Sequence, residues 1–383
     1  MTDMTQMRTW AEIDLDALAH NYHALRAMAP AGCKFLGLVK SNAYGHGAVP
    51  IAQKLERLGT DMLAVACLAE AIELRQAGVA LPILCLGPTP PELMELLPCY
   101  EIIQMVEDFQ TGKHLSAVAQ TAGKAIKVHI KVDTGMGRLG FRWRGGEDSA
   151  PVVEEIMSLC TLPGLETQGL FTHFSDADGS RSYTMAQLER FLQIKTALAA
   201  RGAHFTICHC GSSAAVLHYD CIHMDMIRPG IALYGHRPDP TGDELQGVEL
   251  RPVMSVKSRV YSIRQMGAGD FVSYGRTATL EQETRLAVIP VGYGDGYPRR
   301  LSNKMDMLIR GERCPIVGRV CMDMCMVDVT HLPDLVPWEA VLVYGLELTD
   351  RAARLADTIV YELLCNLSPR IPRIYLEHGA QIG

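Results

Sequence analysis

The segment 39–47, V-K-S-N-A-Y-G-H-G, places a lysine and two closely spaced glycines directly after the apolar run 35–38. A primary amine at the end of an apolar strand loses hydration and shifts toward its neutral, nucleophilic form, which a Schiff base with an aldehyde requires. Gly45 and Gly47 let the backbone approach a bulky anion at the start of the next helix. Lys40 is therefore a candidate for covalent chemistry, against the alternative of a strand that ends in a solvated lysine.

The elements that position Lys40 form a repeated pattern of strand and helix. Short apolar runs, separated by helix-length segments or by loops with Gly and Pro, lie at 35–40, 62–67, 83–87, 102–106, 127–132, 168–173, 205–210 and 224–228. Eight such strands favour a closed, TIM-like (β/α)8 barrel, because parallel strands need crossover helices and closure removes the sheet edges. A doubly wound open sheet is the alternative.

Polar residues follow the predicted strands where a barrel places its functional groups, at the C-terminal ends. They are Lys40, Lys131, Asp133, Arg138, His173, Ser212, Ser213 and Arg228. Phosphate sites in such barrels commonly use the loops after strands seven and eight, where backbone N–H groups point at the anion. Ser213, Gly230 and Ile231 occupy that place.

A second domain is expected after the barrel. The stretch 236–249 is rich in Pro, Gly and acidic residues, which predicts a linker. From Arg251 onward the sequence predicts almost no helices. Strand-like runs lie at 253–263, 286–291, 307–309, 326–329 and 340–343. We therefore predict a barrel at 1–242, including a short strand from Trp10 to Leu15, and a mostly β domain at 243–383.

Composition limits the class of partner. The 383 residues carry a net charge of −7 and no run of five like charges, so we expect a small-molecule partner and no nucleic acid. No apolar stretch approaches the length of a membrane span. The 12 cysteines are scattered, many of them within apolar runs, which is typical of reduced thiols in the cytoplasm, and they lack zinc spacing, so no metal is expected.

Segment 39–47 resembles the cofactor-binding lysine segment of the alanine racemases, and the likeness runs from 8–15 to 370–373. The resemblance implies a fold type III enzyme that uses pyridoxal 5'-phosphate, with Lys40 bound to the cofactor aldehyde. It also implies that Tyr44 holds the phosphate together with Ser213, Gly230, Ile231 and Tyr375 or its neighbours.

The resemblance places Arg228 against the pyridine nitrogen of the cofactor. A guanidinium is not deprotonated in a protein, so that nitrogen must stay unprotonated and accept the hydrogen bond. The ring is then a poor electron sink, which limits side reactions such as transamination. This property suits an enzyme that only removes and returns one proton.

Racemisation needs an acid/base group on each face of the bound amino acid. Lys40 can serve one face, and the resemblance assigns Tyr274 to the other, in the active site of the second subunit of a homodimer. Both groups have ordinary pKa values of about 10, so burial or nearby cations must shift them toward neutrality. Arg138 and His173 are candidates for that effect on Tyr274.

The segment 131–140, K-V-D-T-G-M-G-R-L-G, contains a literal G-x-G-x-x-G. A dinucleotide fingerprint must open an apolar helix, whereas a polar loop follows here, so we do not expect a dinucleotide site. The segment resembles a racemase motif in which Arg138 contacts the substrate carboxylate and Lys131 can be carbamylated to pair with that arginine.

Two segments of the second domain, 291–299 and 318–324, also match the family. The resemblance implies that Tyr293, Met322 and Asp323 line the pocket, with the backbone N–H of Met322 on the substrate carboxylate. Asp178, Arg299 and Arg319 would line its entrance.

Two positions depart from the commonest racemase pattern. Many racemases have Asn-Ser where this chain has Ser212 and Ser213, and many have a tyrosine at the position of Pro369, where it helps to keep the pocket small. Alanine is the first expected substrate, and serine or a broader set is the second, although one hydroxyl shifts discrimination by only about 1–3 kcal/mol.

Two other classes compete with a racemase. Amino-acid decarboxylases place an acid on the pyridine nitrogen, which the R-P-G-I of 228–231 opposes, and non-catalytic pyridoxal phosphate carriers have no use for the β domain. The resemblance therefore implies a cytoplasmic, homodimeric alanine racemase, an isomerase that supplies D-alanine for peptidoglycan of the cell wall.

Overall fold

The computed structural model describes residues 7–146, 150–238, 248–345 and 347–382. The chain forms two compact units: one contains 19–43 and 48–250, and the other contains 1–18, 44–47 and 251–383. Each unit is described by itself. No helix within the described ranges combines the length and the apolar character needed to cross a membrane.

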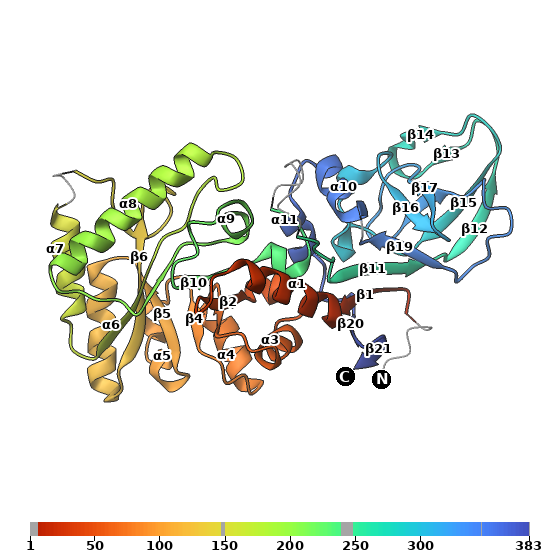
Figure 1. Cartoon of the computed structure of the whole chain (residues 1–383). Coiled ribbons are helices and arrows are strands. Elements are labelled where there is room, and N and C mark those ends of the chain that lie inside the picture. The colour runs from red at the N-terminus through yellow and green to blue at the C-terminus, as the bar shows by residue number, and fades with distance from the viewer. Residues whose placement is uncertain (1–6, 147–149, 239–247, 346, 383) are drawn as a thin grey trace. The chain divides into compact units, whose positions relative to one another are not determined.

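The first unit is a parallel barrel, as the apolar runs predicted (Figure 1). Its strands follow each other in the order β10, β2, β3, β4, β5, β6, β8, β9, and a parallel bridge between Gly211 and Ile227 joins the last strand to the first. The bounds are β2 (Lys34–Leu38), β3 (Met62–Val65), β4 (Ile83–Cys85), β5 (Ile102–Val106), β6 (Ile126–Asp133), β8 (Leu165–Phe171), β9 (Ile207–His209) and β10 (Met226–Ile227), with the short β7 (Phe141–Arg142) beside β6.

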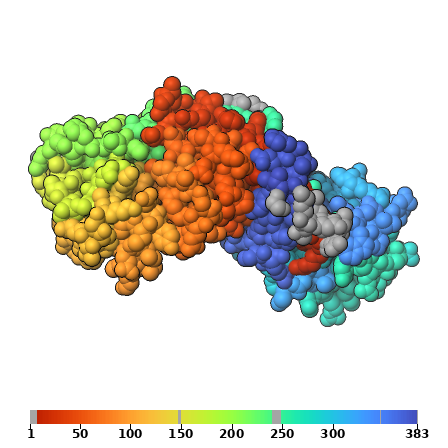
Figure 2. All heavy atoms as spheres, turned by 90° about the horizontal axis from the view of Figure 1, so that it is seen from below, coloured from red at the N-terminus to blue at the C-terminus, as the bar shows by residue number. Residues whose placement is uncertain are grey.

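Helices alternate with these strands and bury one face each. In α8, for example, the buried residues Leu188, Phe191, Ile194 and Leu198 recur at steps of three and four. The helices are α1 (Leu15–Met28), α2 (Lys40–Tyr44), α3 (Ala48–Arg57), α4 (Leu68–Gln76), α5 (Leu96–Cys99), α6 (Phe109–Ala122), α7 (Ala150–Cys160), α8 (Arg181–Ala200) and α9 (Ser213–His218). In the space-filling view of Figure 2, the orange to yellow segments of this unit form one continuous surface.

The second unit is mostly β, as expected. Its largest sheet has the order β17 (Glu312–Pro315), β16 (Asp306–Ile309), β19 (Ala340–Tyr344), β11 (Met254–Arg259), β1 (Thr9–Asp14), β20 (Arg373–Glu377), β21 (Ala380–Ile382). A second sheet contains β12 (Ser262–Met266), β15 (Thr284–Ile289) and β18 (Cys325–Asp328), and a hairpin contains β13 (Phe271–Val272) and β14 (Ala278–Thr279). The run expected at 253–263 is thus divided between β11 and β12.

The N-terminal strand corrects the expected domain division. The first domain, 1–242, was expected to contain the strand that begins at Trp10. Instead β1 lies inside the sheet of the second unit, antiparallel to β11 and parallel to β20. The boundary at 242 and 243, and most of the expected linker, lie outside the described residues.

Two helices also depart from the expectation that helices nearly vanish after Arg251. They are α10 (Glu347–Ala356) and α11 (Val360–Cys365). Leu348, Ala352, Ala353 and Ala356 form the buried face of α10. The helical spacing of these small residues is the physical signal for this helix.

Candidate functional site

A cavity of about 220 Å³ lies at the carboxyl end of the barrel strands. Polar side chains from several strand ends point into this cavity, and apolar residues form the rest of its wall. Its lining consists of Leu38, Lys40, Ala66, Leu86, Gly87, Lys131, Arg138, Leu139, Phe171, His173 and Arg228. Five polar residues from four different strand ends therefore line one small cavity.

The strands position these residues by where they end. Lys40 begins α2 two residues after β2, His173 follows β8, and Arg228 comes directly after β10. Lys131 is the third residue from the end of β6, and it is 5% exposed. In a parallel barrel these ends meet at one rim, which explains the convergence.

The cavity is strongly electropositive. Four of its lining residues, Lys40, Lys131, Arg138 and Arg228, are cationic types, and among the described residues that line it none is acidic. Burial, aided by Arg138 and Arg228, lowers the pKa of Lys131 to about 8. Bringing these charges together without a carboxylate favours an anionic ligand.

Arg228 is 4% exposed and held by several acceptors. One terminal nitrogen donates to Nδ1 and to the carbonyl of His209, the latter at 3.1 Å. The other donates to the carbonyls of Thr172 at 2.9 Å and Cys210 at 3.3 Å, and to His173 Nδ1 at 3.4 Å. Burial lowers the pKa of Arg228 only to about 10, so the guanidinium stays charged at neutral pH.

The histidines around Arg228 are neutral, and their tautomers follow from its contacts. Burial, with Arg228 as the next cause, lowers the pKa of His129 to about 3 and the pKa values of His173 and His209 well below the ordinary range. Since Arg228 only donates, His209 Nδ1 must accept, which places the His209 proton on Nε2. That N–H points at His129 Nδ1, 2.9 Å away. Arg228 is therefore anchored by a chain of uncharged rings.

The loop that carries Arg138 is organised by one carboxylate. Asp133 Oδ1 accepts hydrogen bonds from the backbone N–H groups of Gly135 at 2.9 Å, Met136 at 2.8 Å and Gly137 at 3.1 Å. This turn contains the literal G-x-G-x-x-G, and the two-residue β7 follows it instead of a helix. The glycines thus serve a turn that presents Arg138.

Ser213 and the segment 230–231 come together after strands β9 and β10. Ser213 Oγ accepts from the N–H groups of Gly230 at 2.8 Å and Ala232 at 3.2 Å, which leaves its own hydrogen to donate. The Gly230 N–H therefore donates to Ser213 in this structure, and the expected part of Gly230 in holding a phosphate stays a prediction. Ile231 begins a 3₁₀ helix, so its N–H has no acceptor within that helix.

Tyr44 and Tyr375 belong to the second unit and lie close in it. Tyr44 is 5% exposed, and Tyr375 donates from its hydroxyl to the carbonyl of His46 at 3.2 Å. Gly47 has a φ of +100°, and a Cβ there would lie 1.9 Å from the Tyr375 hydroxyl. The glycine therefore permits the close packing of Tyr375 against 44–47.

Three of the expected second-domain residues share a surface hollow of about 500 Å³. Tyr274, Met322 and Asp323 border it, and Tyr274 is 70% exposed and Met322 54% exposed. Tyr293 borders a different hollow, with Tyr297 and Arg300 among its neighbours. The loops are nevertheless tied together, because the Tyr293 N–H donates to the carbonyl of Cys321 at 3.0 Å.

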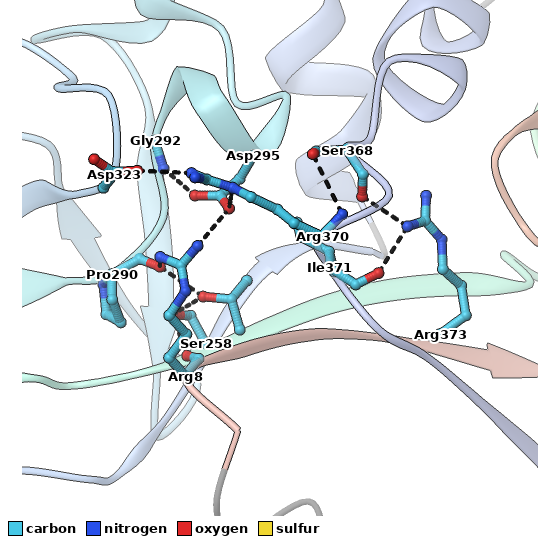
Figure 3. Close-up of polar contacts among 11 residues, drawn as sticks. Arg8, Ser258, Pro290, Gly292, Asp295, Asp323, Ser368, Arg370, Ile371 and Arg373 are labelled. Carbon is cyan, nitrogen blue, oxygen red and sulfur yellow. Dashed lines mark hydrogen bonds and ion pairs between the residues drawn. The ribbon is translucent and has the colours of Figure 1, made fainter. Parts of the chain in front are cut away.

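An ion-pair network holds these loops (Figure 3). Asp295 is fully buried, and its Oδ1 accepts from Arg8 at 2.8 Å and from Arg370 at 2.7 Å. Arg370 also pairs with Asp323 at 2.9 Å, and Asp295 Oδ2 accepts the Gly292 N–H at 2.9 Å. One arginine thus connects the loop of Tyr293 to the loop of Met322 and Asp323.

The expected entrance residues and the two departures differ in exposure. Asp178, Arg299 and Pro369 are exposed, and Arg319 and Ser212 are half-buried. Four features were not predicted from the sequence: His129, Phe171, Asp295 and the pairing role of Arg370. A histidine inside an apolar run is the sequence signal that could have identified His129.

The fold and cavity define a two-domain barrel protein with a lysine at an electropositive site. Residues 13–238 match the family model of the alanine racemase N-terminal domain, and 253–375 match that of the alanine racemase C-terminal domain. The resemblance is thereby confirmed: the chain belongs to the alanine racemase family.

Individual relatives match over nearly the whole chain. Alanine racemase of Desulforamulus reducens is 41% identical over 370 residues, which covers 96% of this chain and 98% of the relative. Alanine racemase of Desulfovibrio desulfuricans is 42% identical over 377 residues, with the same coverage. The structure of alanine racemase from Clostridium difficile 630 superposes with a TM-score of 0.92 at 38% identity, covering 99% of this chain and 98% of that one.

Replacing Asp295 by Asn tests the ion-pair network. The amide keeps the volume but removes the charge that faces two arginines, so we expect the free energy of unfolding to fall by on the order of 3 kcal/mol. Urea unfolding followed by circular dichroism measures this change. Glu154→Gln, which breaks an exposed pair with Arg201, is the control and should leave stability unchanged. Equal effects of the two substitutions would contradict the importance of the buried network.

Proposed function

We infer that this chain is an alanine racemase, an isomerase that interconverts L-alanine and D-alanine with pyridoxal 5'-phosphate. The electropositive cavity with Lys40 and Arg228 at the barrel rim, in a chain of this family, is the observation that carries the inference. Family members at about two-fifths identity bear the same name over their full length.

The residues present fit this cofactor. The cavity offers a primary amine for the aldehyde and excess positive charge for an anionic ligand, and Ser213 has a hydroxyl hydrogen to donate. The bound cofactor withdraws electrons from the substrate and makes its α-proton acidic. Arg228 would hold the pyridine nitrogen by donating to it without giving up its own proton, and this would keep that withdrawal weak.

Two bases move the α-proton. Lys40 takes or returns it on one face, and Tyr274 acts on the opposite face. Arg138 lines the same cavity as Lys40, so positive charge lies near the Lys40 amine. His173, held neutral, accepts from Arg228 at Nδ1 and so carries its proton on Nε2.

Tyr274 acts in a homodimer, where each copy of the chain supplies it to the other's site. Support comes from the surface of the second unit, where Phe271, Tyr274, Met322 and Met324 are 41–70% exposed around one hollow. An apolar and aromatic patch of this kind is typical of an interface. Met322 and Asp323, with Tyr293, complete the substrate site from the same copy as Tyr274.

Arg138 binds the substrate carboxylate and is supported by Lys131. A neutral amine is the form that reacts with carbon dioxide, and the lowered pKa of Lys131 provides it near neutral pH. Carbamylation would turn this cation into an anion beside Arg138 and hold the guanidinium in place.

The product, D-alanine, is used to build the bacterial cell wall. The protein acts in the cytoplasm. All 12 cysteines lie within the described residues and none of them is in a disulfide, which is consistent with a reducing compartment.

The substrate assignment is tested with purified, cofactor-loaded protein given L-alanine and L-serine in parallel, with chiral chromatography of the products. We expect a kcat/KM for alanine that exceeds that for serine by at least about tenfold, within the range that one hydroxyl can discriminate. A preference for serine would mean that Pro369 enlarges the pocket. Turnover of neither would contradict the proposed function.

The two-base assignment is tested by Tyr274→Phe. The variant should keep the bound cofactor, because Lys40 is intact, but lose one proton-transfer group. In deuterated water we expect α-proton exchange of one enantiomer, L-alanine, to fall by about 10²-fold or more, and exchange of D-alanine to fall far less. Proton NMR follows both reactions. Equal losses for the two enantiomers would contradict the assignment.

A further inference from the structure

The turn that follows Lys40 is strained. Ser41, Asn42 and Ala43 have φ values of 55°, 53° and 52°, which is the left-handed helical region. For residues with a side chain this conformation costs about 1–2 kcal/mol each. Such strain persists only where surrounding contacts hold it in place, and it is commonly found at functional sites.

Glu70, the third residue of α4, supplies such a contact. Its Oε1 accepts a hydrogen bond from the backbone N–H of Ser41 at 2.6 Å. Its Oε2 accepts one from the backbone N–H of Ala66 at 2.7 Å. One carboxylate thus bridges the segment after β2 to the segment after β3.

Both bridged segments border the cavity. Lys40 and Ala66 are lining residues, and Ser41 directly follows Lys40. Two other contacts hold the turn: Asn42 Oδ1 accepts the Ala48 N–H at 2.8 Å, and the Ala43 N–H donates to the carbonyl of Val39, the residue before Lys40, at 2.8 Å. Among the described side-chain hydrogen bonds to the backbone of the turn, that of Glu70 to Ser41 is the one next to the lysine.

The bridge depends on a carboxylate. Two short N–H donors, one to each oxygen, are what an ionised Glu accepts, and charge-assisted bonds of this kind are about twice as strong as neutral ones. A glutamine of the same size offers one accepting oxygen and one NH₂, so it leaves one of the two backbone N–H groups without its acceptor.

We propose that Glu70 is a positioning residue that maintains the left-handed turn and so directs the Lys40 amine into the cavity. The proposal rests on the proposed function, since it concerns how fast and how firmly Lys40 binds the cofactor aldehyde. Correct placement of a nucleophile can raise a reaction rate by several orders of magnitude. If the turn relaxes toward ordinary φ values, Lys40 is placed less precisely and its reaction with the aldehyde slows.

The test compares Glu70→Gln with Glu73→Gln, a control on the exposed side of the same helix. Hydrogen exchange followed by mass spectrometry reports on the segment 39–46 in the cofactor-free protein. The absorbance change on adding pyridoxal 5'-phosphate gives the rate of attachment, and borohydride reduction followed by peptide mapping confirms Lys40 as the residue modified.

For Glu70→Gln we expect exchange in 39–46 to be faster and attachment to be slower, each by about tenfold or more. In the racemase assay kcat should fall while KM changes little, because the substrate contacts remain. Glu73→Gln should match the wild type. Wild-type exchange and attachment in Glu70→Gln, or the same losses in both variants, would overturn the proposal.

A second variant covers the possibility that Glu70→Gln does not fold. Glu70→Asp keeps the charge but is one methylene too short to reach both N–H groups, so attachment should again be slowed. Wild-type attachment in Glu70→Asp would overturn the proposal. Failure of the wild type to bind the cofactor would count against the proposed function instead, while the exchange of 39–46 would still decide the role of Glu70.

Discussion

The concentration of positive charge at the barrel rim is the constraint on which the site depends. Lys131 and Arg228 are 5% and 4% exposed, and no described residue that lines their cavity is acidic. Desolvating like charges together is costly, and an anionic ligand offsets that cost. The barrel makes the arrangement possible because its strands end at one rim, so residues distant in sequence converge. The cavity is thus prepared for an anion before any ligand arrives.

Neutral histidines keep that charge in place. A carboxylate beside Arg228 would satisfy the guanidinium more strongly, but it would also cancel the charge that the site presents. His209 Nδ1 instead accepts from Arg228, and His129 Nδ1 accepts from His209, so the direction of donation fixes the tautomer of His209. In the proposed function, this arrangement would favour a weak electron sink. In the second unit, by contrast, Arg8 and Arg370 do pair with the buried Asp295, where stability of the loops is the requirement.

The sequence predicted the barrel, its strand ends and the β character of the second unit, because hydrophobic runs and turn residues are local signals. Lys40, Lys131, His173 and Arg228 could be found for the same reason. The place of β1 in the second sheet could not, since a strand's own pattern does not specify partners more than 200 residues away. Three hydrogen bonds likewise depend on tertiary contacts: from the Gly230 N–H to Ser213, between His209 and His129, and from the Ser41 N–H to Glu70.

In the proposed function, Arg228 limits the chemistry of the site to proton transfer. The most direct test of this role is the ratio of racemisation to transamination for Arg228→Glu, measured as alanine enantiomers by chiral chromatography and as pyruvate formed in the same reaction. A carboxylate would keep the pyridine nitrogen protonated. We therefore expect the variant to keep its fold and the ratio of racemisation to transamination to fall by about tenfold or more. An unchanged ratio in a folded, cofactor-loaded variant would contradict this role of Arg228.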